Sequence, residues 1–233
     1  MPKSLVPKMR RSLADQCAEI GVPFSRIELP RDHAGWKVSG KPYLRPEHAV
    51  AALMRADGWT CATCEGGAML LLMKAACLQR LMELNKLGAT DSLRRFLEAQ
   101  FVINAQNIDS IIAAIATTSI DQVCANFEAI YAAGVDEYYP GVSVDLIRQL
   151  HGALGPLLPR IAARFATDPY AFRAGWPDVT AVRDGMILLR EVKTSDKLHA
   201  SQMQTIGGML IAEGMPVDVL QLVAAKIAAP TSR

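Results

Sequence analysis

The sequence predicts an α/β fold, a small mixed sheet flanked by helices, and three observations support this. Two strand-like runs, Val179 to Val182 and Met186 to Leu189, surround Asp184-Gly185, a residue pair favoured in two-residue type I′ turns. Helix signals dominate residues 46–166, between Pro46 and the hairpin. A final strand is expected at Val217 to Val223, after a helix that follows the hairpin.

The elements before the hairpin follow from local signals. We expect a short helix near Ser12–Ile20, then irregular structure punctuated by Pro and Gly through Pro42. A helix should begin at Pro46, because Pro is favoured in the first turn, and end near Gly58. A short strand at Trp59–Thr63 and a buried, strongly apolar helix from Gly66-Gly67 to about Leu84 complete this half.

The middle of the chain is predicted to be almost entirely helical. Glycine and proline divide it into five expected helices: Asp91–Phe101, Asn107–Thr117, Ile120–Ala133, Val144–His151 and Leu157–Phe165. After the hairpin we expect a helix from Leu198 to Glu213, which Gly214 would end.

The length predicts one compact domain, and the distribution of charge indicates that it binds a polyanion. The chain has 233 residues, is 51% hydrophobic and has a net charge of only +2. Residues 1–46 contain nine Lys or Arg and four acids, so the positive charge gathers at the start of the chain. Such a basic arm supplies the salt-sensitive part of nucleic-acid binding, although a solvated tail has the same charge pattern.

The sequence does not indicate a membrane protein or a protein stabilised by disulfide bonds. The most apolar stretch, Ala68 to Met73, is far shorter than the roughly 20 residues of a membrane span, and Pro7 to Arg11 interrupts any secretory signal. Five cysteines, an odd number, are expected to be reduced in a cytoplasmic protein. Cys61 and Cys64 form a single CxxC that lacks a second pair for zinc, and the four histidines are dispersed.

The hairpin brings chemistry-bearing side chains together. If Asp184 and Gly185 are the loop residues, Asp178 lies directly across from Glu191. Opposed carboxylates repel one another in a sheet, so a cation is expected between them. Lys193 lies two residues beyond Glu191 and shares its face of the strand. Carboxylates that bind Mg²⁺ or Mn²⁺ beside a lysine are the groups that phosphodiester hydrolysis needs.

Several segments together resemble one known family. They are Pro46-Glu47-His48-Ala49-Val50, Asp57-Gly58-Trp59, Glu65-Gly66-Gly67, Arg173-Ala174-Gly175-Trp176-Pro177-Asp178, Glu191-Val192-Lys193, Asp196-Lys197-Leu198 with Gln202, and Gly214 with Val217-Asp218-Val219. This pattern is similar to the VRR-NUC branch of the PD-(D/E)XK nucleases, specifically the nuclease lobe of the Fanconi-associated nuclease family. The chain departs from it at Thr194-Ser195, where the family often has glycine.

The resemblance implies a PD-(D/E)XK core with a large helical insertion at about residues 88–166. The similarity covers most of residues 46–224, which we expect to be the nuclease domain, while the charge pattern indicates a basic arm at residues 1–45 and residues 225–233 are expected to form a tail. The implied catalytic residues are Glu65, Asp178, Glu191 and Lys193, with Gln202 in support. Mg²⁺ or Mn²⁺ would be held by Glu65, Asp178, Glu191 and the backbone carbonyl of Val192, and DNA by Arg173 and Lys197.

The third carboxylate involves a choice between Glu65 and Glu47. Glu47 has a local explanation as a first-turn acid that complements the helix dipole. Glu65 precedes two glycines and a buried helix, where an unpaired carboxylate would be costly without a metal ion. We therefore expect a buried Glu65 that points into the cleft between Asp178 and Glu191.

The expected function is a divalent-metal-dependent DNA nuclease selective for flap or branched DNA, located in the cytoplasm, at the nucleoid or in the nucleus. One alternative is a homodimeric endonuclease that resolves four-way junctions. A second alternative is a DNA-binding module with a vestigial site, which the intact acids and lysine disfavour.

Overall fold

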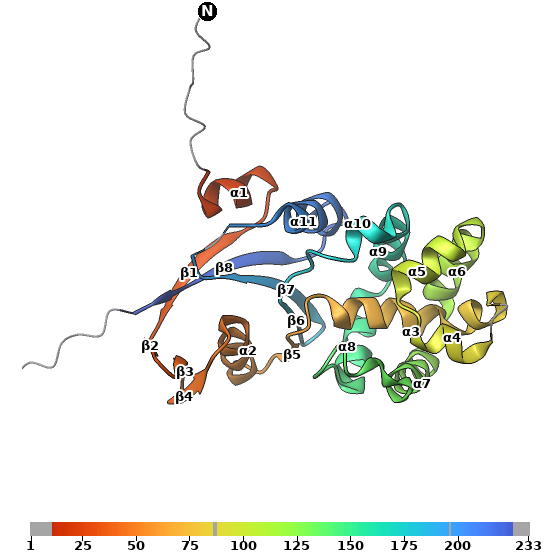
Figure 1. Ribbon diagram of the computed structural model, residues 1–233, viewed down its shortest axis with the longest axis horizontal. Helices are drawn as coiled ribbons and strands as arrows, with labels where there is room; N and C mark the ends of the chain where they lie inside the picture. The colour runs from red at the N-terminus through yellow and green to blue at the C-terminus, as the bar shows by residue number, and fades with distance from the viewer. Residues whose placement is uncertain (1–10, 86–87, 196, 226–233) are drawn as a thin grey trace, which may run out of the picture.

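The computed structural model describes residues 11–85, 88–195 and 197–225. A central five-stranded sheet runs through it, with helices on both faces (Figure 1). Its strands lie in the order β1 (Phe24–Leu29), β8 (Val217–Ala224), β7 (Met186–Lys193), β6 (Val179–Arg183) and β5 (Thr60–Ala62). The sheet is mixed, since β1, β8 and β7 are parallel neighbours while β6 is antiparallel to both β7 and β5.

The predicted hairpin is confirmed. Arg183 pairs with Met186, and both loop residues have positive φ, 51° at Asp184 and 75° at Gly185, as a type I′ turn requires. Val179 pairs with Arg190, so Asp178 precedes the ladder by one residue. In this register, Asp178 and Glu191 lie across from each other at the end of the hairpin.

Residues 24–43 form strands, so the expected irregular structure there is wrong. β1 pairs along its length with β8, from Phe24 opposite Val219 to Leu29 opposite Ala224. Next, β2 (Arg31–Asp32), β3 (Gly35–Val38) and β4 (Lys41–Tyr43) form a small antiparallel sheet. The described part of the predicted basic arm thus adds a strand to the same sheet as residues 46–224.

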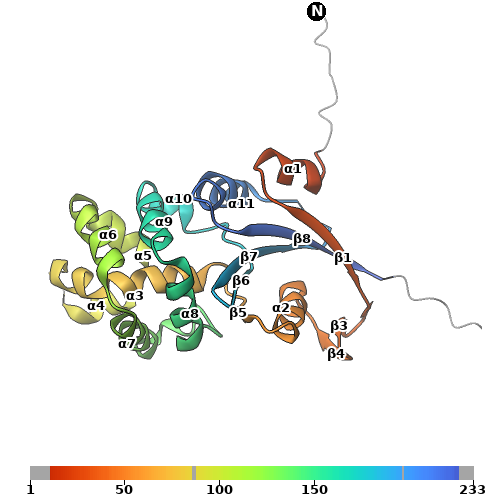
Figure 2. The ribbon, with the colours of Figure 1, turned by 180° about the vertical axis from the view of Figure 1, so that it is seen from behind.

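Two helical layers cover the faces of the sheet (Figure 2). On one face, α2 (Pro46–Ala56) buries apolar side chains of β6, β7 and β8, among them Val179, Val192 and Leu220. On the other face lie α1 (Leu13–Glu19) and the helix formed by α11 (Ala200–Gln202) and the π-helical η3 (Met203–Ile211). These pack over Leu189 and Val219. Both predicted helices and the stop at Gly214, whose φ is 81°, are confirmed within a few residues.

The helical insertion forms a separate layer beyond the sheet. It packs around α3 (Gly67–Leu84), which precedes the insertion in the chain and is buried on nearly all sides as predicted. Around it lie α4 (Ala89–Arg94), α5 (Leu97–Ile103), η1 (Ala105–Asn107), α6 (Ile108–Thr117), α7 (Ile120–Ile130), η2 (Tyr131–Val135), α8 (Val144–Leu154) and α9 (Leu157–Ala166), and α10 (Pro169–Phe172) leads back to the hairpin.

One predicted helix of this layer is wrong. Asp91–Phe101 is two helices, because Arg95 and Phe96 take extended conformations and Phe96 turns toward two tyrosines. Among the described residues, no single helix has the length and apolarity to cross a membrane, although the bent pair Ala105–Thr117 and Ile120–Val135 has them jointly.

Candidate active site

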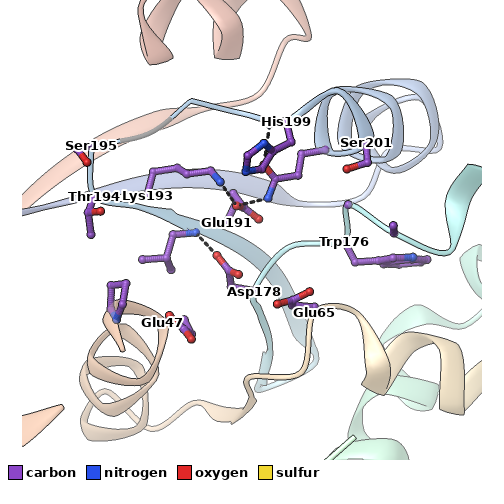
Figure 3. Close-up of a pocket in the computed structure, with 15 residues that line it drawn as sticks. Glu47, Glu65, Trp176, Asp178, Glu191, Lys193, Thr194, Ser195, His199 and Ser201 are labelled. Atoms are coloured by element: carbon purple, nitrogen blue, oxygen red, sulfur yellow. Dashed lines mark hydrogen bonds and ion pairs between the residues drawn. The ribbon is translucent and has the colours of Figure 1, made fainter. Parts of the chain in front are cut away.

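A cavity of about 630 Å³ opens where the start of β6 and the end of β7 meet α2, the loop before α3 and the start of α11 (Figure 3). Its lining is mostly polar and includes every predicted catalytic residue. It comprises Pro46, Glu47, Glu65, Ala174, Gly175, Trp176, Asp178, Glu191, Val192, Lys193, Thr194, Ser195, His199, Ser201 and Gln202. The fold thus brings Glu65 to the hairpin from more than a hundred residues away in the sequence.

Strand alternation places Glu191 and Lys193 on one face of β7. Val192 between them packs under α2, so its two neighbours must point to the opposite side, toward α11. Lys193 Nζ lies 3.0 Å from Glu191 Oε1, and both side chains are buried, at 5% and 1% exposed. A buried ion pair of this kind needs further hydrogen bonds to be tolerated.

Gln202 supplies one of those hydrogen bonds. Its Nε2 donates to Glu191 Oε1 over 2.5 Å, while its Oε1 accepts from the backbone N–H of His199 over 3.0 Å. The second bond fixes the amide, because only its oxygen can face a backbone donor. Gln202 therefore acts both in the capping box of α11 and as a support for Glu191.

Asp178 is held by the backbone of the neighbouring strand. Its Oδ2 accepts a hydrogen bond from Val192 N–H over 2.8 Å. The preceding segment is anchored on both sides. A Cβ on Gly175 would lie 2.2 Å from Ser201 O, and the buried Trp176 donates from Nε1 to Phe172 O over 2.7 Å. The Gly-Trp dipeptide therefore sets where Asp178 enters the strand.

Glu65 lies at the cavity, but the expected burial is wrong because its side chain is exposed. The physical reason is the loop conformation: Glu65 has φ of 45°, unusual for a residue with a Cβ. Gly66 then packs on Trp176, where a Cβ would lie 2.2 Å from the ring. Such strained positions concentrate at functional sites. The loop of Glu65 is thus joined to the segment of Asp178.

Glu47 also lines the cavity, which its explanation as a first-turn acid did not anticipate. It does begin α2, and its side chain is 22% exposed, 3.8 Å from Arg45. Glu47 and Glu65 therefore both face the cavity that holds Asp178 (Figure 3).

Burial and crowding of negative charge perturb the two central carboxyl groups. Burial raises the pKa of Asp178 to about 6, and the charges of Glu47 and Glu65 add to this. Burial, followed by the charge of Asp178, raises the pKa of Glu191 to about 8. Glu191 Oε2 is buried and has no hydrogen-bond partner. An unsatisfied, buried carboxylate oxygen is a position that a bound cation would stabilise.

The donor set fits a hard divalent cation. Within the described ranges, no three or more His, Cys, Asp or Glu side chains are arranged to hold a metal ion. Mg²⁺, however, is commonly bound through one or two carboxylates and keeps several waters. Asp178 and Glu191, with the Val192 carbonyl and Glu65 as further oxygen donors, match that requirement in a polar cavity.

The two residues predicted to contact DNA, Arg173 and Lys197, do not line the same cavity. Arg173 is exposed, lies over the Tyr170 ring at 5.4 Å and lines a second, adjoining cavity. Lys197 is exposed and lines neither cavity, and Asp196 lies outside the described residues.

The CxxC cysteines have different surroundings. Cys61 is buried in β5 and Cys64 is half-buried next to Glu65; burial raises the pKa of both thiols, that of Cys64 to about 11.

Sequence reasoning gave no site role to several residues of the cavity wall, namely Trp176, Thr194, Ser195, His199 and Ser201, and it weighed Glu47 only as the less favoured third carboxylate. Their signals were ordinary ones, such as a helix start, a turn or a dispersed histidine. Only the Gly175-Trp176 pair, next to Asp178, had a position in the sequence that could have indicated a structural role.

Solved structures support the fold. No family model and no curated protein matches the chain. The chain is similar to the crystal structure of paFAN1 bound to a 2-nucleotide 5′-flap DNA with a gap, with 15% identity and a TM-score of 0.64 over 95% of this chain and 40% of that one. A second paFAN1 structure, with a 1-nucleotide flap, has 16% identity and a TM-score of 0.57 over 94% and 45%.

The chain spans less than half the length of these structures. Its mixed sheet with flanking helices is a PD-(D/E)XK-like core that carries a helical insertion. The chain therefore shares the fold of paFAN1 over this region, as the resemblance to the nuclease lobe of the Fanconi-associated nuclease family predicted.

Proposed function

We propose that the protein is a divalent-metal-dependent nuclease that hydrolyses phosphodiester bonds in flap or branched DNA. The observation that carries the proposal is the cluster formed by the buried Glu191 and Lys193 with the half-buried Asp178 and Gln202 at an open, polar cavity. Raised carboxyl pKa values, a buried lysine and an unsatisfied carboxylate oxygen together are costly for stability and are typical of an active site.

Each residue of the cluster has a role in this chemistry. Asp178 and Glu191 would hold Mg²⁺ or Mn²⁺, which when bound neutralises the phosphate and lowers the pKa of a coordinated water. Lys193, held by Glu191, brings a fixed positive charge to the place where negative charge develops on the phosphoryl oxygens. Gln202 keeps Glu191 oriented through the helix start.

The choice of flap DNA rests on the fold comparison. The paFAN1 structures contain 5′-flap DNA, and this chain aligns with them over nearly its whole length. The cavity lies at the surface between the sheet, α2 and the start of α11, where a DNA strand can reach it.

Cleavage of a panel of labelled DNAs tests the proposal. Purified protein with Mn²⁺ should cut 5′-flap DNA faster than nicked, four-way, single-stranded or plain duplex DNA of the same sequence. Lys193→Met, which keeps the length of the side chain but removes its charge, should lower the rate by about 100-fold or more. Preferred cleavage of four-way junctions would favour the dimeric resolving enzyme, and binding without any cleavage would favour the vestigial module.

A further inference from the structure

A second cavity of about 500 Å³ adjoins the first. The two share three carboxylates, Glu47, Glu65 and Asp178, so they form one continuous depression. The far wall of the second cavity comes from the segment between α7 and α8 of the helical insertion and includes Tyr138 and Tyr139. Volumes of a few hundred Å³ suit a ligand the size of a nucleotide.

Tyr138 presents an aromatic ring at this wall. Tyr138 is 63% exposed, which is a large value for an aromatic residue in a folded protein. The ring is nevertheless held in place, because Phe96 packs against it nearly at right angles with centroids 5.2 Å apart. Phe96 also contacts Tyr139 at 6.3 Å. A fixed, exposed ring is the arrangement on which an unpaired base stacks.

The charges of the cavity select a base rather than a run of phosphates. Glu137 is the carboxylate that lines this cavity alone, Glu47, Glu65 and Asp178 line both cavities, and two guanidinium groups complete the charged lining. Carboxylates accept hydrogen bonds from the amino groups of bases but repel phosphates. The two arginines, Arg45 and Arg173, are exposed and can pair with the phosphates on either side of a single nucleotide.

We propose that the second cavity holds one unpaired nucleotide of the DNA substrate next to the scissile phosphate, with its base stacked on Tyr138 and its phosphates at Arg45 and Arg173. The inference rests on the proposed nuclease function and makes Tyr138 a specificity-determining residue for unpaired DNA.

A double-mutant cycle that combines a change in the DNA with a change in the protein tests this proposal. The substrate is a 5′-flap DNA in which each of the first three flap nucleotides is replaced in turn by an abasic residue. For the wild-type protein, kcat/KM should fall about ten-fold at one position, as expected for one lost stacking contact. Tyr138→Ala should lower kcat/KM about ten-fold on the intact flap, and the abasic residue at that one position should lower it no further. Tyr138→Phe should behave as the wild type.

Ile103→Ala provides the matched control, because Ile103 is 59% exposed in the same helical layer and lines neither cavity. It should leave all rates unchanged. Wild-type rates for Tyr138→Ala, or an abasic effect that persists in it, would overturn the inference. The same comparison is then made for DNA affinity, with Kd measured by fluorescence anisotropy on metal-free protein. If the abasic residue and Tyr138→Ala weaken binding in the expected way but no DNA is cleaved, the nuclease proposal is refuted and the stacking proposal stands.

Discussion

Replacement of Glu191 by Gln should make the metal-free protein more stable at neutral pH, although it removes a residue of the proposed active site. The carboxyl group is 1% exposed, and its pKa is raised from 4.5 to about 8. Between these two values the folded protein holds a proton that the unfolded chain has released, so its stability falls as pH rises. Gln carries no such proton and has almost the shape of the protonated carboxyl group.

The magnitude follows from the pKa shift. At pH 7, about 2.5 units above the unfolded value of 4.5, the penalty on the wild-type protein is about 3 kcal/mol, since each unit is worth about 1.4 kcal/mol. The penalty disappears below about pH 4.5, where both states are protonated, and reaches its full size above about pH 8.

Urea unfolding in EDTA between pH 4.5 and 8.5 measures this difference. The free energies of unfolding of wild type and Glu191→Gln should coincide at low pH and separate by up to about 3 kcal/mol at pH 7, with the variant more stable. Glu128→Gln, at an exposed position on α7, is the control and should change little at any pH. A Glu191→Gln variant that is less stable at pH 7, or a difference that does not vary with pH, would refute the reasoning.

Three further predictions concern the surroundings of the cluster. Gly66→Ala should destabilise the protein by about 2–4 kcal/mol, since its Cβ would collide with the tryptophan ring and its φ is 81°; chemical denaturation should find only about 1 kcal/mol for Gly141→Ala, which has φ of 82° and open space. Gln202→Ala should weaken Mn²⁺ binding about 10- to 100-fold by calorimetry, because the buried carboxylate loses its orienting partner; unchanged affinity would remove that role. Glu65→Gln should lose far more cleavage activity than Glu47→Gln, and the reverse order of rates would transfer the third-carboxylate role to Glu47.

Local signals in the sequence predicted the hairpin and its register. The Asp184-Gly185 turn sets the pairing by itself, and alternation along β7 then puts Glu191 and Lys193 on one face. The break at Phe96 was missed because nothing in the residues around it opposes a helix. Phe96 contacts Tyr138 and Tyr139, which lie far along the chain, and no local signal in the sequence reports those contacts.

Features that depend on distant parts of the chain could not be read from the sequence. β1 was missed because its partner, β8, lies at the other end of the chain, and because the alternation of Arg26 and Glu28 with Ile27 and Leu29 covers only four residues. Glu47 was set aside because a helix-start acid and an active-site acid look the same in sequence. Only the packing of α2 against the sheet brings it to the cavity.

The most direct test of the account is the cleavage of 5′-flap DNA by wild type and Asp178→Asn during a Mn²⁺ titration. Asn keeps the size of the side chain and can still accept the hydrogen bond from Val192 N–H, so the hairpin should be preserved. The account predicts that the wild type is inactive in EDTA and is activated by Mn²⁺, and that Asp178→Asn stays inactive at every concentration while it still binds the DNA. Metal-independent cleavage by the wild type, or full Mn²⁺-activated cleavage by Asp178→Asn, would contradict it.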